Sequence, residues 1–334
     1  EIAWLVLPDL YLSRSGLDAS YATLSHRIVT SALDGEGLRA VTGALGLQQE
    51  FSEERQTNFE MGEEVIAGVL DRPGVVSELS LIHTALQFRT PGRRSGELTR
   101  VWLNALVEGD ELEAEAVRNH DRLEYEVEAT FSALDERGEL HQRAATFRAR
   151  VLEELEDEAG IPVRLSLDLA PGEYEFSVVV RDANDTRQRP AGNWTSDSLT
   201  VRRFDARLPQ LSDIAFAPDS GGSWNPVPGV SLPLTPMSVT DDSGNAWLYV
   251  EAYGLSPRGE YTTEVRMEPR DEGEAFTLTY SGAPPSSAEE AVQRLFRLEL
   301  GDSDPGGYVA TVTVTDALGR RSLPTQTDLV VRNR

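Results

Sequence analysis

The sequence predicts a mainly β protein: two tandem β-sandwiches that follow a small, mainly helical N-terminal segment. From Leu79 onward, apolar and polar residues alternate with a period of two, in short runs divided by Gly, Pro and Asp. A strand-and-turn phrase in the first half of this region returns in the second half, which indicates an internal duplication. The predicted divisions are a helical segment over residues 1–78, a first sandwich over 79–204 and a second over 205–334.

The first 78 residues carry the helical period instead. Apolar side chains recur at helical spacing over residues 18–32, where Asp18 or Ser20 can cap the first turn. A second amphipathic pattern covers residues 59–70, after an acidic first turn and before Pro73. This segment is expected to pack as a small helical unit.

Strand-like runs then follow one another, each ending in turn residues. The stretch "LDERGEL" between two of them fits a short hairpin turn. The acidic run over 151–160 is interpreted as a solvated connection, with a short helix as the alternative. The runs before this connection cover residues 79–90, 97–108, 122–134 and 139–151.

The duplication is clearest in "PGEYEFSVVVRDA" (171–183) and "PGGYVATVTVTDA" (305–317), which align at an offset of 134 residues. Tyr174 and Tyr308 are expected to fill equivalent core positions, because alternation puts Tyr174 on the apolar face of its strand. "LTVR" (199–202) and "LVVR" (329–332) extend the match, as do two "VEA" and two "RGE" triplets.

Each copy is about 130 residues long, with about seven short strands, which is typical of an immunoglobulin-like or fibronectin-like β-sandwich. The chain contains no cysteine, so each sandwich is held by packing without a disulfide. The near absence of helical patterns in both copies disfavours a doubly wound α/β enzyme fold.

Composition excludes several classes of function. The 31 basic residues are all Arg and stand against 56 acidic residues, a net charge of −25 that repels nucleic acid and anionic lipid. Without Lys or Cys there is no Schiff-base chemistry, thiolate nucleophile or iron–sulfur cluster. No apolar stretch is long enough to span a membrane, and a start at Glu1 in place of Met favours an exported protein.

No catalytic site is predicted. The sequence has no G-x-S-x-G motif, and its histidines, at positions 26, 83, 120 and 141, do not show metal-ligand spacing. Two acidic loops, "TDDSGNAW" and "GDSDPGG", are weak calcium candidates, although Asp and Gly are equally typical of ordinary turns. Their candidate ligands are Asp241, Asp242, Asp302 and Asp304.

Tryptophans are the candidate partner-binding residues. Trp194 and Trp224 lie in loops rich in Gly, Pro and Asn, where a large ring either caps a sandwich core or anchors a partner. Trp4, in the N-terminal segment, is the third candidate.

The phrases "LDLAPGEYEFSVVVRDA", "LPQLSDIAFA" and "AWLYVEAYGLSPRGEYTTEV", with "WLVLPDLYL" near the start, resemble extracytoplasmic bacterial proteins of the GWxTD-domain type. The GWxTD string itself is absent, since "GNWTSD" (192–197) has a different spacing. The resemblance implies export to the cell envelope and a role in interaction.

The expected function is therefore that of a non-enzymatic, peripheral subunit of the periplasm or cell envelope. It would dock on and stabilise a protein or a membrane-protein complex, such as a photosynthetic or respiratory assembly, without a cofactor. The alternatives are a carbohydrate-binding or calcium-dependent adhesion module and, third, a hydrolase whose acidic residues come together from separate loops.

Overall fold

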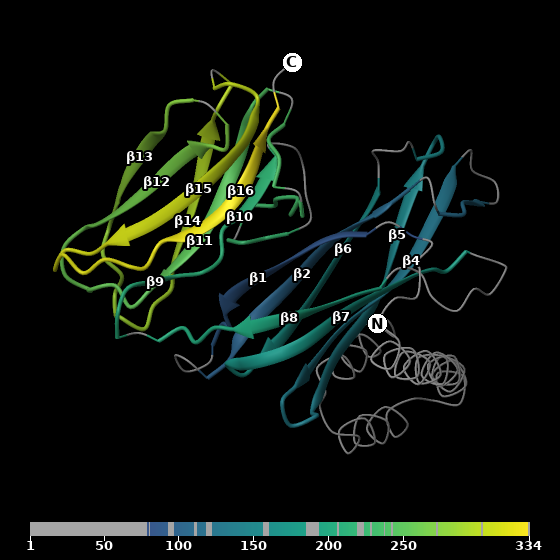
Figure 1. The fold of residues 1–334 in the computed structure, drawn as a ribbon, viewed down its shortest axis with the longest axis horizontal. Coiled ribbons are helices and arrows are strands. Elements are labelled where there is room, and N and C mark those ends of the chain that lie inside the picture. The colour runs from purple at the N-terminus through teal and green to yellow at the C-terminus, as the bar shows by residue number, and fades with distance from the viewer. Residues whose placement is uncertain are drawn as a thin grey trace, which may run out of the picture. The chain divides into compact units, whose positions relative to one another are not determined.

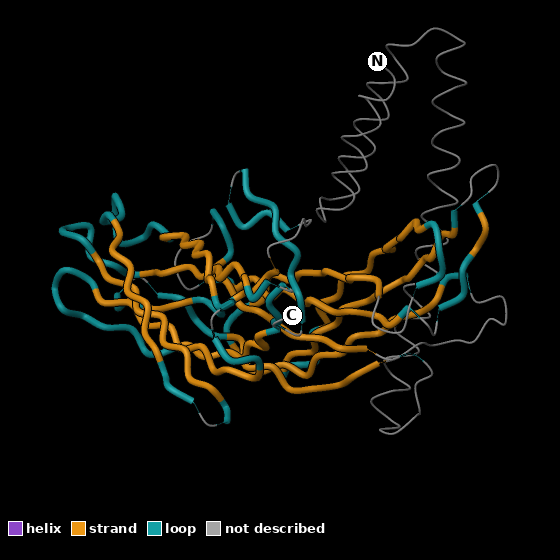
Figure 2. The backbone as a smooth tube through the Cα atoms, turned by 90° about the horizontal axis from the view of Figure 1, so that it is seen from above, coloured by secondary structure: helices purple, strands orange, loops and turns teal. Residues whose placement is uncertain are grey.

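The computed structural model describes residues 79, 81–92, 97–109, 112–117, 122–155, 160–184, 194–205, 207–218, 224–227, 229–236, 238–241, 243–271, 273–301 and 303–332. These residues form strands and loops without a helix, and so include no helix that could cross a bilayer (Figures 1 and 2). The mainly β prediction is confirmed. The helices predicted at 18–32 and 59–70 lie outside the described residues.

The first set of strands forms two sheets. One sheet has the order β1-β2-β6. The other has the order β3-β4-β7-β8, and its fifth strand, β5, also pairs with β4. All the pairings are antiparallel. The strands are β1 (Leu81–Arg89), β2 (Thr99–Glu108), β3 (Glu115–Ala116), β4 (Leu123–Asp135), β5 (Leu140–Val151), β6 (Gly160–Leu169), β7 (Gly172–Asp182) and β8 (Trp194–Val201).

The second set repeats this arrangement. One sheet has the order β10-β11-β14, with β9 pairing on β11, and the other has the order β13-β12-β15-β16. The strands are β9 (Gln210–Leu211), β10 (Ala215–Pro218), β11 (Asn245–Tyr253), β12 (Tyr261–Pro269), β13 (Phe276–Gly282), β14 (Val292–Glu299), β15 (Gly306–Thr315) and β16 (Thr325–Val331).

Apart from the two-residue strands β3 and β9, the two sets have one topology. The first, second and fifth strands form one sheet, and the third, fourth, sixth and seventh form the other. Paired antiparallel sheets of this kind are the architecture of immunoglobulin-like and fibronectin-like domains. β7 and β15, which carry the duplicated phrase, hold the same place in their sheets.

Each sandwich encloses its own core. Phe131 and Leu103 are completely buried in the first, and Leu248 and Met267 in the second. Burying one such side chain stabilises the fold by about 1.5–3 kcal/mol. The face of β7 that the alternation predicts to be apolar is indeed buried, as is the matching face of β15: Tyr174, Phe176, Val178, Val180, Tyr308, Ala310, Val312 and Val314.

The duplicated phrase builds a tyrosine corner in both sandwiches. The Tyr174 hydroxyl donates to the carbonyl of Ala170 at 3.0 Å, and the Tyr308 hydroxyl donates to the carbonyl of Asp304 at 2.9 Å. In each case a tyrosine near the start of the sixth main strand bonds back to the turn that enters the sheet. The conserved spacing within the repeat therefore has a structural cause.

An Asp-x-x-Gly turn occurs three times in the described chain. In each, the Asp backbone N–H donates to the carbonyl four residues on, and one carboxylate oxygen accepts two further backbone N–H groups at 2.7–3.0 Å. The glycine has a positive φ, which suits a type I turn with a G1 bulge. The turns begin at Asp135, Asp241 and Asp316, and their glycines are Gly138 (φ 80°), Gly244 (φ 75°) and Gly319 (φ 74°).

The shorter repeats are not structural equivalents. The first "VEA" lies in β4, but the second lies in β11, which corresponds to β2. The two "RGE" triplets likewise precede non-equivalent strands, β5 and β12. Triplets recur by chance in an acidic, strand-rich chain. The long match and the "LTVR"/"LVVR" match, which ends the equivalent strands β8 and β16, are the parts that report the duplication.

Replacing Tyr174 or Tyr308 with Phe should lower the free energy of unfolding by about 1 kcal/mol, because each loses one hydrogen bond from a half-buried hydroxyl. Tyr280→Phe is the matched control, since the Tyr280 ring stacks on Phe296 at 4.2 Å and its hydroxyl makes no hydrogen bond to a described residue. Denaturant unfolding measures all three. Equal stability of the corner variants and the control would contradict the corner's role.

Candidate functional site

Part of the outer face of the β1-β2-β6 sheet is apolar, and residues of the second sandwich pack against that part. Leu86 and Phe88 of β1 are 8% and 4% exposed, yet they belong to neither sandwich core. They form a third cluster, here called the inter-sandwich cluster. Its buried members are Leu86, Phe88, Ala215, Ala217, Trp224, Leu232, Leu234 and Tyr249, with Trp102 and Trp247 half-buried against them.

Trp224 lies at the centre of the inter-sandwich cluster. Its ring meets Tyr249 edge to face, with centroids 5.0 Å apart, and Phe88 at 6.0 Å. The backbone around it is closed by paired hydrogen bonds with Leu232. Trp224 is only 7% exposed, so other residues of the chain cover the ring that the sequence suggested for partner binding. Trp224 thus packs inside the chain, although in a cluster separate from the two sandwich cores whose capping the sequence predicted as one alternative.

Gln87 adds polar contacts beside the aromatic rings. Its backbone N–H donates to Asp213 Oδ2 at 2.7 Å, and its carbonyl accepts the Asp213 N–H at 3.0 Å. Its side chain donates to the Thr200 carbonyl and accepts the Arg202 N–H. Arg202 also pairs with Asp213 Oδ1 at 2.6 Å. Burial raises the pKa of Asp213, and Arg202 and the Gln87 N–H oppose that rise.

Glu251 joins two tyrosines in the same region. Its carboxylate accepts hydrogen bonds from Tyr249 at 2.6 Å and from Tyr253 at 2.7 Å, while the Tyr253 hydroxyl also accepts the Arg89 N–H. Burial, followed by the nearby Glu251 charge, raises the pKa of both phenols above the usual value. Both therefore stay protonated at neutral pH and donate to Glu251 within β11. The Arg89 N–H, which the Tyr253 hydroxyl accepts, ties β1 to β11.

The other two tryptophan candidates are Trp194 and Trp4, and only the backbone of Trp194 lies within the described residues. The sequence predicts Trp194 in a loop. In the structure it is the first residue of strand β8, opposite Val179. Its side chain lies outside the described residues, and so does the whole of Trp4.

The two acidic loops proposed for calcium lie side by side. A Cβ on Gly244 would come within 2.7 Å of the Gly301 backbone, and Leu300 N–H donates to the Gly244 carbonyl. Asp241 Oδ1 already accepts two turn N–H groups, and the Asp304 carbonyl accepts the Tyr308 hydroxyl. These oxygens thus serve the turn and the tyrosine corner. Asp242 and Asp302 lie outside the described residues.

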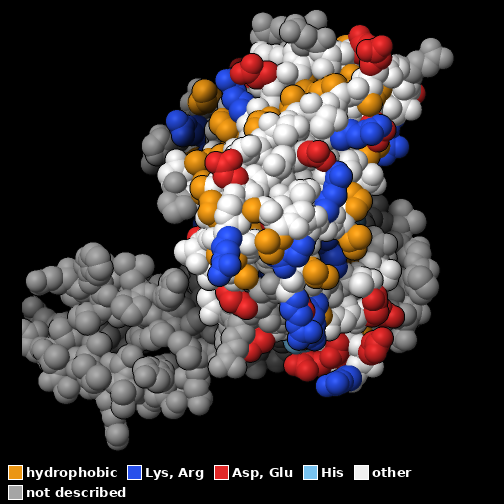
Figure 3. All heavy atoms as spheres, turned by 90° about the vertical axis from the view of Figure 1, so that its left-hand side faces the viewer, with side chains coloured by type: hydrophobic (Ala, Val, Ile, Leu, Met, Phe, Trp, Pro, Cys, Tyr) orange, Lys and Arg blue, Asp and Glu red, His pale blue; other side chains and the backbone are white. Residues whose placement is uncertain are grey.

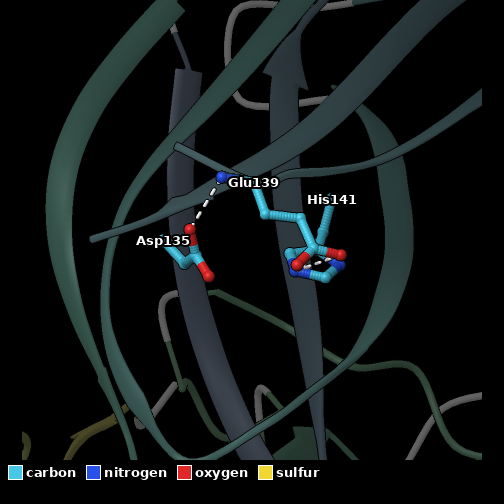
Figure 4. Close-up of side chains that lie close together, drawn as sticks. All are labelled: Asp135, Glu139 and His141. Atoms are coloured by element: carbon cyan, nitrogen blue, oxygen red, sulfur yellow. Dashed lines mark hydrogen bonds and ion pairs between the residues drawn. The ribbon is translucent and has the colours of Figure 1, made fainter. Parts of the chain in front are cut away.

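A different group of possible metal ligands meets at the β4–β5 hairpin. Asp135, Glu139 and His141 each place one ligand atom within 4.8 Å of the others (Figure 4). Asp135 Oδ1 accepts the Glu139 backbone N–H at 2.7 Å, and Glu139 Oε1 lies 4.0 Å from His141 Nε2. The His141 ring is held edge-on to Tyr174 at 6.0 Å. One imidazole and two carboxylates are ligands that suit zinc or manganese.

This hairpin group was not evident from sequence because its members are brought together by strand pairing. Asp135 and Glu139 face each other across the turn, and His141 follows two residues later on the same face. The signal would have been Asp-x3-Glu-x-His spanning a hairpin turn. Glu139 has a side chain that is 71% exposed, and within the described residues no further ligand joins the three.

Exposed leucines mark one end of the second sandwich, here called the leucine end. Leu318 and Leu323 flank Arg320 in the β15–β16 connection and are 66% and 85% exposed. Arg320 pairs with Asp316 at 2.6 Å and donates to the Arg207 carbonyl at 3.1 Å, which brings in Leu208, 64% exposed. Figure 3 views the second sandwich from the left of Figure 1, where apolar side chains (orange) are interspersed with charged ones.

Replacing Trp224 with Ala should destabilise the chain by about 3–5 kcal/mol, because it leaves a cavity among Phe88, Tyr249 and Leu232. Thermal unfolding would measure this loss. Leu152→Ala, at a side chain that is 72% exposed, is the control and should change stability by less than about 0.5 kcal/mol. An unchanged Trp224→Ala melting curve would show that the inter-sandwich cluster does not hold the two sandwiches.

Replacing Asp241 with Ala should cost about 1–2 kcal/mol in buffer containing a chelator, since two turn N–H groups lose their acceptor. Chemical denaturation with and without added calcium separates the two roles. A loss of stability that occurs only when calcium is present would assign Asp241 to the metal and not to the turn.

No known protein family matches this chain, and no curated protein matches it. Among solved structures, red sea bream transglutaminase is 11% identical, with 81% of this chain and 33% of that chain covered, at a TM-score of 0.21. The chain thus spans about a third of that enzyme's length. The FN1–FN3 domains of chicken CNTN1 are 9% identical (78% and 91% covered, TM-score 0.21), and the fibronectin(III)-like modules of Clostridium thermocellum CbhA are 10% identical (75% and 94% covered, TM-score 0.21). At these scores the two-sandwich description rests on the chain's own sheets.

Proposed function

We propose that this chain is a non-enzymatic structural or binding protein that docks on a protein partner through the leucine end of its second sandwich. The observation that carries the proposal is the exposure of Leu208, Leu318 and Leu323 around one anchored arginine. Scattered single leucines are ordinary on protein surfaces, whereas apolar side chains gathered at one loop cluster favour association.

Arg320 holds the leucine end in place through hydrogen bonds to three other residues. The Arg320 guanidinium bonds to Asp316, to the carbonyl of Arg207 in the connection between the sandwiches, and to the carbonyl of Gly254 at the end of β11. The Asp316 carboxylate in turn accepts the Ser256 N–H. Loops held in this way lose little conformational entropy on binding, which favours recognition by a fixed surface.

The inter-sandwich cluster also supports the proposed docking function. Trp224 and Tyr249 supply aromatic packing, and Gln87 and Asp213 supply paired hydrogen bonds, so that the first sandwich serves as a rigid base for the second. A non-catalytic subunit that braces another protein needs this kind of stiffness. We further propose that the partner is a protein or membrane-protein complex of the cell envelope. This part rests on the sequence resemblance alone.

The test compares tagged chains expressed in the native cells and recovered after mild cross-linking. The wild-type chain should bring down one stoichiometric partner, and Leu318→Ser with Leu323→Ser should weaken that capture about tenfold or more, because two apolar contacts are lost. Leu152→Ser, at a leucine of similar exposure on the first sandwich, is the matched control and should retain the partner.

The result can fail in two clear ways. Recovery of the wild-type chain only as a free protein would overturn the docking function. Equal capture by the double variant and by the control would show that the partner binds elsewhere. Melting curves of both variants should match the wild type, since exposed substitutions change stability by less than about 0.5 kcal/mol.

A further inference from the structure

Strand β5 forms a long edge of its sheet. It has 12 residues and, within the described residues, pairs only with β4. The corresponding strand of the second sandwich, β13, has only 7 residues. The side chains of Arg143, Ala144, Ala145 and Thr146 are exposed on both faces of β5. A bare edge of this length is a template for another strand.

The hairpin fixes which backbone groups of β5 are available. Asp135 N–H donates to the Glu139 carbonyl at 3.0 Å, so these two residues form a hydrogen-bonded pair. Because such pairs alternate along an antiparallel ladder, the odd-numbered residues of β5 bond to β4. The even-numbered residues, from Gln142 to Arg150, therefore direct their N–H and carbonyl groups away from the sheet.

We propose that this edge pairs antiparallel with β5 of a second copy of the chain, about a two-fold axis at Thr146. In this register Thr146 faces its own copy, Ala144 faces Arg148, and Gln142 faces Arg150. On the other face, Ala145 meets Phe147 and Arg143 meets Ala149. Apart from Gln142 and Arg150, each pair sets a long side chain opposite a short one, and a threonine pair, which is favourable across strands, lies at the centre.

Neighbouring registers fit less well. An axis one residue earlier, at Ala145, sets Phe147 against Arg143, two long side chains. An axis two residues later, at Arg148, sets that arginine against its own copy, and like charges directly opposite are destabilising. The axis at Thr146 also uses nearly the whole strand.

Charge favours a second copy at this edge. The chain carries a net charge of −25, so two copies repel each other over most of their surface. β5 contains no acidic residue, and its Arg148 and Arg150 are paired with Glu126 and Glu124 of β4. The outer face of the hairpin is thus locally neutral, and Arg143 adds a positive charge. The two copies meet here with little repulsion.

A cysteine scan tests the register, because the chain has no cysteine of its own. In the proposed dimer the two residues at position 146 form a hydrogen-bonded pair with Cα atoms about 5.5 Å apart, within disulfide range. The two residues at position 144 are displaced by four residues, about 13 Å along the strands. Under mild oxidation Thr146→Cys should form a disulfide-linked dimer, and Ala144→Cys, the matched control, should stay monomeric.

A charge pair at one position tests the same contact without oxidation. Ala144→Glu would face Arg148 of the second copy twice per dimer and should tighten the dimer about tenfold, and Ala144→Arg should weaken it about tenfold. Sedimentation equilibrium of the full chain over a concentration series measures both. The two substitutions share one exposed site, so their effects on the monomer, followed by thermal unfolding, should be similar.

Three outcomes would overturn the proposal: a wild-type chain that stays monomeric throughout the series, cross-linking of Ala144→Cys as efficient as that of Thr146→Cys, or equal effects of Glu and Arg at position 144. The leucine end lies on the other sandwich. Leu318→Ser with Leu323→Ser should therefore leave the dimer unchanged, which keeps this test independent of the proposed docking function.

Discussion

The packing of Trp224 between Phe88 and Tyr249 is the contact on which the joint structure of the two sandwiches depends. Each sandwich already has a complete core, so nothing within either one requires the other. What joins them is the apolar surface of Leu86 and Phe88 on β1, which belongs to neither sandwich core and packs against Trp224 and Tyr249. Burial of that face favours the joined state, and the hydrogen bonds of Gln87 and Asp213 select one orientation within it.

Much of the fold follows from sequence because two local rules dominate it. Alternation identified the strands, and the boundaries of β4, β5 and β7 agree with the predicted runs to within about a residue. The tyrosine corner preserved the repeat around Tyr174 and Tyr308, since a hydroxyl bonded four residues upstream fixes both spacing and residue type. Short identities such as "VEA" carry no such constraint, and they aligned strands that are not equivalent.

The candidate site was less predictable, because its residues are defined by contacts between distant segments. The Gly-rich and Pro-rich surroundings of Trp224 left two roles open, capping a sandwich core or anchoring a partner. Only the position of Phe88, far away in sequence, shows that the ring is covered. The meeting of Asp135 with His141 needed the hairpin register. Asp241 was readable in part, since Asp-x-x-Gly is a turn signal, and its carboxylate is used as that signal implies.

The position of the inter-sandwich cluster also bears on how the chain is made. Its first contributor, β1, begins at Leu81, whereas Trp224 and Tyr249 come more than a hundred residues later. During synthesis from the N-terminus, the first sandwich can complete its own core while Leu86 and Phe88 still face solvent. The nascent chain therefore passes through a stage with an adhesive apolar face, and that stage ends only when β11 has emerged and folded.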